Sequence, residues 1–288
     1  MIRLDAATVL LQWAAGGLLF LWVTTRRREV GLGYGWLLRG IYLAMAVAAA
    51  VLGRRYGSVP VREAAAVGMA VAAGVALAVS IVRRRSGVTG QLERREHRAA
   101  RVAAMTGIRR PDRTDQPAAG PGAAEFPPIL DLVAPLIGAV GLVAAALDAG
   151  GNPALAVART LVGAAFLGSV SDAMLLGHWY LVQPRLARAP LVEVVKAALY
   201  VWPAEVGLLL VPTGMVSVLT GAVDDGYGGL LGWFWLACAA TTGGLLVVAR
   251  AALRERYYSA VMATTGLLYL AILTAFGTDL VARAALAG

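Results

Sequence analysis

Charged residues are scarce in this sequence of 288 residues, because Asp, Glu, Lys and Arg make up only 15% of it while hydrophobic residues make up 59%. A soluble domain carries about 25% charged residues and cannot bury this much apolar surface in one core. The composition therefore excludes a water-soluble globular domain and a disordered chain. It predicts an integral membrane protein that crosses the bilayer several times.

Metal-binding side chains are also few, with one cysteine and two histidines in the whole chain. A single cysteine, Cys238, excludes a disulfide scaffold and a thiolate metal site. His178 is the only histidine in an apolar segment, so this chain cannot supply two histidine ligands to a haem. P-loop and Gly-x-Ser-x-Gly motifs are absent too. We expect no metal, no cofactor held by the chain's own ligands and no catalysis by this chain alone.

Basic residues are almost all arginine, since Lys196 is the only lysine among 26 basic residues, and the formal net charge is +9. In a soluble protein this charge would indicate nucleic acid. Here most of the arginines lie in short segments beside apolar stretches, where they orient helices and contact anionic lipid head groups. We therefore predict the lipid bilayer as a partner and exclude nucleic acid.

Eight apolar stretches are long enough to cross a membrane as helices, because a hydrocarbon core of about 30 Å needs about 20 residues. They cover residues 6–24, 35–53, 60–82, 129–148, 153–183, 190–221, 229–249 and 258–282. The sequence thus predicts an all-α bundle of about eight transmembrane helices.

The arginines predict how this bundle is oriented. Segments that follow the first, third, fifth and seventh spans contain 18 arginines, whereas those on the opposite side contain five. Cytoplasmic segments carry the excess of basic residues. We therefore place both termini outside and the long segment 83–128 in the cytoplasm, in a membrane of the bacterial cytoplasmic type.

Segment 83–128 is the only long stretch between spans. Its first half is rich in arginine, which fits either a short surface helix or a solvated connector, and its second half is a linker rich in Pro, Ala and Gly. It divides the chain into a three-helix unit, 1–82, and a five-helix unit, 129–288. We expect the arginine-rich half to be the docking surface for protein partners of a hetero-oligomeric complex.

Two carboxylates stand out inside the spans, because an ionisable group in hydrocarbon costs several kcal/mol. Glu205 is predicted near the middle of span 190–221, where Pro203 and Pro212 disturb the helix and free backbone carbonyls. The structural alternative is a protonated Glu205 that is hydrogen-bonded to a neighbouring helix. Asp172 is predicted slightly to the cytoplasmic side of the middle of span 153–183.

Polar and aromatic residues are densest just after Asp172, in the run from Gly177 to Pro184. His178 is predicted at the inner boundary of the hydrocarbon, where an imidazole can titrate or donate a hydrogen bond to a ligand carbonyl. The alternative is an interfacial histidine among anchoring aromatics. A short turn joins the fifth and sixth spans, so their polar residues are expected to line one pocket in the inner half of the membrane. The candidates for ligand binding or proton relay are Asp172, His178, Trp179, Tyr180, Tyr200, Trp202 and Glu205.

Two functions fit these candidates. The first is a membrane subunit of a larger, respiratory-type electron-transfer complex that contacts a quinone through His178, Tyr180 and Asp172. The alternative is a proton-coupled secondary transporter with a broken-helix site at Glu205 and Asp172. A structural scaffold subunit, packed through small residues, is a further alternative. A membrane-embedded transferase or hydrolase ranks last, because no pair of nucleophile and base is recognisable.

Overall fold

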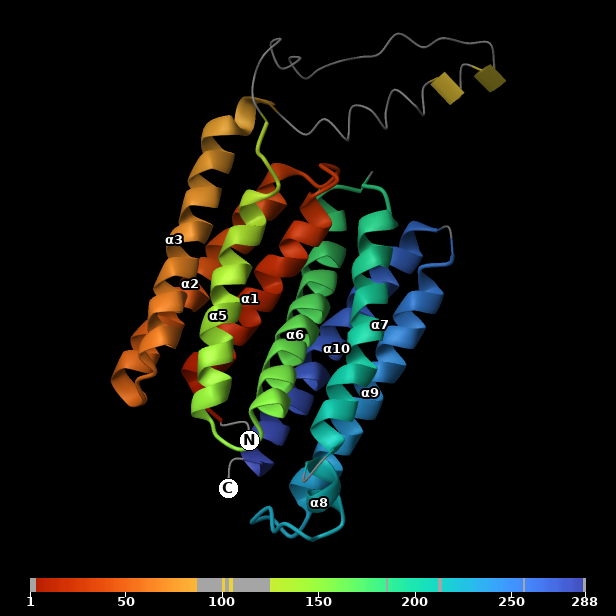
Figure 1. Cartoon of the computed structure of the whole chain (residues 1–288). Helices are drawn as coiled ribbons and strands as arrows, with labels where there is room; N and C mark the ends of the chain where they lie inside the picture. The colour runs from red at the N-terminus through yellow and green to blue at the C-terminus, as the bar shows by residue number, and fades with distance from the viewer. Residues whose placement is uncertain are drawn as a thin grey trace.

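The structure is a computed structural model in which long helices run side by side as one bundle (Figure 1). It describes residues 4–86, 100–101, 104–105, 125–184, 186–211, 214–255 and 257–286. Most of segment 83–128 lies outside these ranges, so its predicted surface helix, linker and docking surface do too. Every regular element within the described ranges is a helix, and the predicted all-α membrane fold is confirmed.

Eight long helices and one short one follow each other among the described residues. They are α1 Ala6–Thr25, α2 Leu32–Tyr56, α3 Pro60–Val82, α5 Leu130–Asp148, α6 Pro153–Val182, α7 Ala189–Leu210, α8 Met215–Leu219, α9 Leu230–Ala252 and α10 Tyr258–Ala285, with a 3-10 turn, η1, at Arg83–Ser86. Helix starts follow ordinary capping rules. The Asp5 side chain accepts bonds from the first free N–H groups of α1, and Pro153 occupies the first turn of α6 after Asn152.

Seven of these helices are long and apolar enough to cross a membrane. Helix α7 falls outside that set because Glu193, Lys196 and Glu205 lie within its 22 residues, yet it runs alongside the others (Figure 1). Many apolar side chains point outward from the bundle, as contact with lipid requires; examples are Val71, Val140 and Leu273, all more than half exposed. Eight crossings remain a prediction, whereas a multi-pass helical bundle is established.

Both chain termini lie at the same end of the bundle (Figure 1). The opposite end is where α3 ends and α5 begins. An even number of antiparallel crossings requires this arrangement. We name the end with the termini the outer end and the opposite end the inner end, after the orientation that the arginines predict.

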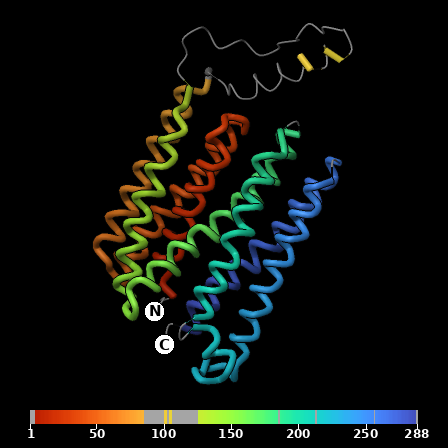
Figure 2. The backbone as a smooth tube through the Cα atoms, turned by 45° about the vertical axis from the view of Figure 1, so that its right-hand side comes forward, coloured from red at the N-terminus to blue at the C-terminus, as the bar shows by residue number. Residues whose placement is uncertain are grey.

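The helices pack as two groups of four. Helices α1, α2, α3 and α5 contact one another, and α6, α7, α9 and α10 form the second group (Figure 2). Helix α5 therefore packs with α1 and α3 although it follows segment 83–128. The groups meet mainly where α1 packs against α6.

Glycines allow α1 and α6 to approach each other closely. A Cβ atom added to Gly16 would lie 1.8 Å from the carbonyl oxygen of Ala164, and one added to Gly168 would lie 2.1 Å from the backbone of Gly16. Such contact between backbones is typical of membrane helices that associate through small residues. The backbones of the two groups are thus in direct contact at Gly16 and Gly168.

The sixth predicted span is wrong as a single helix over 190–221. Helix α7 ends at Leu210, and the separate helix α8 begins at Met215. The break was expected from the prolines, but it leaves Glu205 only five residues from the outer end of α7 instead of at mid-span. Arg159 of α6 donates hydrogen bonds to the carbonyl oxygens of Leu208 (2.8 Å) and Val211 (3.0 Å) and so satisfies this helix end.

Candidate functional site

The structure distributes the seven candidate residues over the bundle. Asp172, Tyr180 and Glu205 are buried; Trp179 and Trp202 are partly buried; His178 and Tyr200 are exposed. They do not line one pocket in the inner half. Asp172 lies in the inner part of α6, whereas Glu205 lies near Arg159, which precedes Asp172 by 13 residues, about 20 Å of helix. Convergence was expected because a short turn joins the two spans, but Asp172 lies in the inner part of α6 whereas Glu205 lies five residues from the outer end of α7.

Asp172 is held between the two groups of helices. Tyr42 of α2 donates its hydroxyl to Oδ1 of Asp172 at 2.6 Å, and the hydroxyl of Tyr34 lies 3.4 Å from the backbone carbonyl of the same residue. Oδ2 is buried without a hydrogen-bond partner in the described part of the chain. Next to it, the Trp13 indole of α1 donates to Ser171 at 2.7 Å. Every one of these bonds connects α6 to the first group.

Glu205 is fully buried, and neither of its carboxylate oxygens has a hydrogen-bond partner among the described residues. Its electrostatic neighbours are Asp279 and Arg283 of α10 and Arg159 of α6. Burial and the Asp279 carboxylate disfavour a negative charge on Glu205, whereas the two arginines favour it. Opposing effects of this kind are what a reversible proton site requires.

A buried network on α10 and α1 lies beside Glu205. Asp279 accepts hydrogen bonds from Gln12 (3.0 Å) and from Arg283 (2.8 Å), and Arg283 also donates to the Gln12 carbonyl oxygen. All three side chains are almost completely buried. Gly163 of α6 leaves room for the network, because a Cβ atom there would lie 2.7 Å from Gln12. The network connects the two groups on the outer side of the α1–α6 contact.

Sequence reasoning missed this network. Neither Asp279 nor Arg159 was among the candidate residues, yet Asp279 is 1% exposed and Arg159 only 5%. Two signals were present in the sequence. Asp279 and Arg283 have the i, i+4 spacing of a helical ion pair, and Gln12 is an amide in an otherwise apolar stretch.

A second buried ion pair lies near the inner end. Arg39 of α2 binds Asp131 of α5 through two bonds of 2.7 Å, with Thr25 and Ser80 as further polar contacts. The Arg39 guanidinium also lies 4.4 Å from the ring centre of Phe126. Arg39 therefore stays inside the bundle, where a carboxylate on a helix distant in sequence satisfies its charge.

His178 points away from the interior. Its Nδ1 lies 3.3 Å from the hydroxyl of Tyr269 on α10, and the two rings are nearly perpendicular. Both side chains are exposed on the outside of the bundle. The pair therefore faces the surroundings of the bundle instead of an internal pocket.

The remaining candidates have structural contacts. Trp179 donates to Gln183, which in turn accepts from the backbone N–H of Gly31. The Tyr180 hydroxyl donates to the carbonyl of Ala187 in the turn before α7. Trp202 donates to the carbonyl of Ala239 on α9 (2.9 Å), and Tyr200 is 78% exposed.

The chain matches no protein-family profile, no curated protein and no solved structure. The site alone therefore carries the functional argument. It consists of two buried carboxylates. Asp172 accepts a hydrogen bond across the interface of the two four-helix groups, whereas Glu205 lies among α6, α7 and α10 of the second group. They lie on opposite sides, along the bundle axis, of the contact between Gly16 and Gly168.

Proposed function

We propose that this protein is a proton-coupled secondary transporter in which Glu205 takes up and releases the coupling proton. The observation that carries the proposal is the buried Glu205 carboxylate, which has no hydrogen-bond partner in the described structure but has two arginines and an aspartate nearby. A carboxylate kept only for packing would be expected to have a hydrogen-bond donor in this environment. Ionisable residues inside membranes are characteristic of proton pathways.

Charge balance supports reversible protonation at this position. Arg159 already donates to two carbonyls, and Arg283 is already paired with Asp279. Neither arginine is committed to Glu205, so a small shift of α7 relative to α6 or α10 would change the stability of its charge. In a low-dielectric interior, a change of a few ångströms between charges alters their interaction energy by several kcal/mol. Protonation of Glu205 and movement of the helices are thus coupled.

Asp172 gives the transporter a second carboxylate, on the inner side of the α1–α6 contact. Its bond to Tyr42 crosses between the two groups of helices, as the bond from Gln12 to Asp279 does on the outer side. Transporters alternate access by moving one helix group against another around a central site. Hydrogen bonds on both sides of the Gly16–Gly168 contact are suited to such a movement. The inner bond to Asp172 can break while the outer bond to Asp279 stays intact, and the reverse is also possible.

A pH jump on reconstituted protein tests this proposal. Proteoliposomes on a solid-supported membrane should give a transient current when the outside pH changes, since a buried site gains or loses protons. Glu205→Gln should remove most of this current. The matched control is Glu193→Gln on the same helix, whose native carboxylate pairs with Arg26 and Arg27 near the surface. Equal currents in the wild type and Glu205→Gln would overturn the proposal.

A second function, a quinone-contacting subunit of an electron-transfer complex, is favoured by the His178–Tyr269 pair. A quinone head group reaches its site from the lipid, and this pair offers an imidazole and a phenol on the exposed surface of the bundle. The chain would then obtain electrons from partner subunits docked on segment 83–128. Copurification from the native membrane distinguishes the two functions. Stoichiometric haem, flavin or iron–sulfur subunits and a quinone-linked activity that His178→Ala lowers would support this second function.

A further inference from the structure

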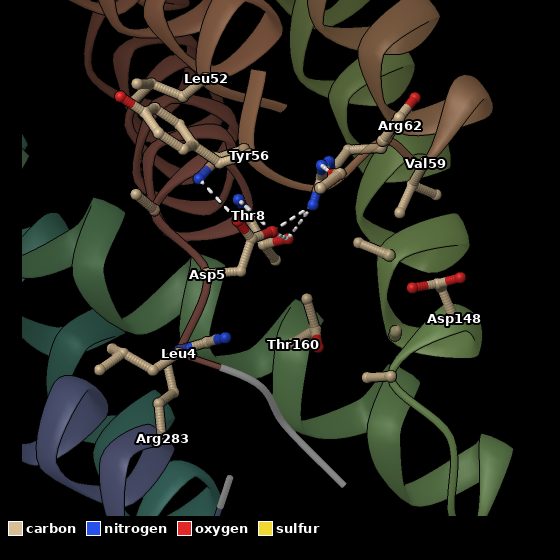
Figure 3. A pocket seen from close by; sticks show the side chains of 17 residues that line it. Leu4, Asp5, Thr8, Leu52, Tyr56, Val59, Arg62, Asp148, Thr160 and Arg283 are labelled. Carbon is tan, nitrogen blue, oxygen red and sulfur yellow. Dashed lines mark hydrogen bonds and ion pairs between the residues drawn. The ribbon is translucent and has the colours of Figure 1, made fainter. Parts of the chain in front are cut away.

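A pocket opens at the outer end of the bundle, between the N-terminal turn, the α2–α3 loop and the end of α5 (Figure 3). Its volume is about 520 Å³, enough for many water molecules. Residues from six helices or their ends line it, among them Thr8, Ser58, Arg62, Asp148, Thr160 and Arg283. Apolar side chains such as Leu4 and Leu52 also line it, but its charged and hydroxyl groups favour water over lipid tails.

The charges in the lining are compensated within the protein. Arg62 donates to Asp5 and Thr8, as the dashed lines in Figure 3 show, and also binds Glu63 at 2.7 Å. Arg283 is paired with Asp279 behind the pocket. Because each arginine already has a carboxylate partner, the pocket offers little net attraction to an anion. The pocket is therefore better suited to hold water and to conduct protons than to bind an anion.

The pocket and the Glu205 site share one residue. Arg283 lines the pocket, binds Asp279 and Gln12, and is an electrostatic neighbour of Glu205. Thr160 of α6 lines the pocket beside Arg159, the other cationic neighbour of Glu205. Polar side chains therefore extend from the pocket to the neighbourhood of Glu205, where Arg283 and Arg159 interact with the carboxylate through charge and not through a hydrogen bond.

We propose that this pocket is the water-filled entrance through which protons reach Glu205 from the outer end, with Arg283, Asp279 and Gln12 forming the polar connection between them. This inference rests on the proposed function, because it names the route to the same site. It adds a direction: Glu205 exchanges protons with the outer side, whereas Asp172, beyond the Gly16–Gly168 contact, does not exchange through this pocket.

The single native cysteine makes the route testable by thiol labelling. In a Cys238→Ala background, Ala149→Cys places a thiol at a half-buried position of the pocket lining, and Val140→Cys places one on the exposed apolar face of α5. A charged, water-soluble methanethiosulfonate should react at least about 10-fold faster with the pocket thiol, because thiolates form in water and not in hydrocarbon. If Ala149→Cys does not fold, Ser58→Cys probes the same lining from the α2–α3 loop, where the residue is exposed.

Labelling should also slow proton delivery. The reagent adds a bulky charge to the pocket, so the pH-jump current that depends on Glu205 should slow about 10-fold or disappear, while labelled Val140→Cys keeps its current. Equal reactivity of the pocket and surface thiols overturns the inference. So does a labelled pocket with an unchanged current. If the unlabelled protein has no current that depends on Glu205, the proposed function fails and the pocket's role in it fails too, although the labelling rates still report whether the pocket holds water.

Discussion

At the scale of single residues, the bundle contains ionisable groups that are stable only in pairs. The Arg39–Asp131 pair is 3% and 1% exposed at its side chains and is bound by two short hydrogen bonds. Removing one member leaves the other charged and without a partner in a medium that cannot solvate it. Asp131→Asn should therefore destabilise the protein by about 3–5 kcal/mol. Thermal unfolding in detergent measures this loss.

Replacement of the whole pair is the control. Arg39→Leu combined with Asp131→Leu removes both charges and should recover most of the stability lost by the single variant, since apolar residues often replace a buried ion pair at little cost. A double variant that is less stable than Asp131→Asn would contradict the account. It would show that the polar contacts to Thr25 and Ser80 matter more than the charge balance.

The sequence was informative about which single residues are buried and less so about their partners. Glu205 and Asp172 were recognisable from their depth in apolar stretches, and both are fully buried. Asp279 and Arg39 were not singled out, because their partners Gln12 and Asp131 lie on other helices. Helix periodicity constrains neighbours on one helix and not contacts between helices distant in sequence.

At the scale of helices, the α1–α6 contact depends on the absence of side chains. Gly168→Ala places a methyl group 2.1 Å from the backbone of Gly16, so the helices must separate, and stability should fall by about 1–3 kcal/mol. Gly266→Ala is the matched control, because nothing lies within 4 Å of its added Cβ and alanine favours a helix by about 0.5–1 kcal/mol. Thermal unfolding should rank Gly266→Ala at or above the wild type, and the reverse order would contradict the close contact.

The connection between α8 and α9 is organised by Asp225. Its carboxylate accepts hydrogen bonds from the backbone N–H groups of Gly229, Tyr227 and Leu231 at 2.8–2.9 Å. These bonds lower the pKa of Asp225, and the bond from Gly229 has the largest effect. Because the pKa of Asp225 is lower in the folded than in the unfolded state, the ionised carboxylate stabilises the loop at pH values above about 3.9, the pKa of an unfolded Asp. This contribution is lost as the pH falls through the folded-state pKa.

Hydrogen exchange measures this effect. At neutral pH, Asp225→Ala should reduce the protection of the amides of Tyr227, Gly229 and Leu231, whereas Asp224→Ala should reduce it much less, because Asp224 accepts one bond from Gly226. In the wild type, protection corrected for intrinsic exchange should decline only below about pH 3.9. Equal loss of protection in the two variants would contradict the assignment.

Apolar runs predicted the positions of all the long helices except that of span 190–221. The predicted spans 60–82 and 129–148 differ from α3 Pro60–Val82 and α5 Leu130–Asp148 by at most one residue at each end. The span 190–221 failed because an apolar run does not reveal where a helix breaks inside it. Arg159 satisfies the end of α7, and that contact comes from another helix.

At the scale of the whole molecule, the orientation of the bundle is still a prediction. Both termini lie at one end (Figure 1), and the arginine count places that end outside. A C-terminal alkaline phosphatase fusion should therefore be active and a C-terminal green fluorescent protein fusion dark, with the opposite pattern for fusions truncated after Arg83. An active phosphatase after Arg83 and a fluorescent C-terminus would reverse the orientation and place the pocket in the cytoplasm.

The central claim is that Glu205 exchanges a proton inside the bundle. Infrared difference spectroscopy of the reconstituted protein tests it most directly, because a protonated carboxyl has a carbonyl band that an ionised carboxylate lacks. The account predicts a band that appears as the pH is lowered, shifts in deuterium oxide and is missing in Glu205→Gln but present in Glu193→Gln. The same spectrum in wild type and Glu205→Gln at every pH would contradict the claim.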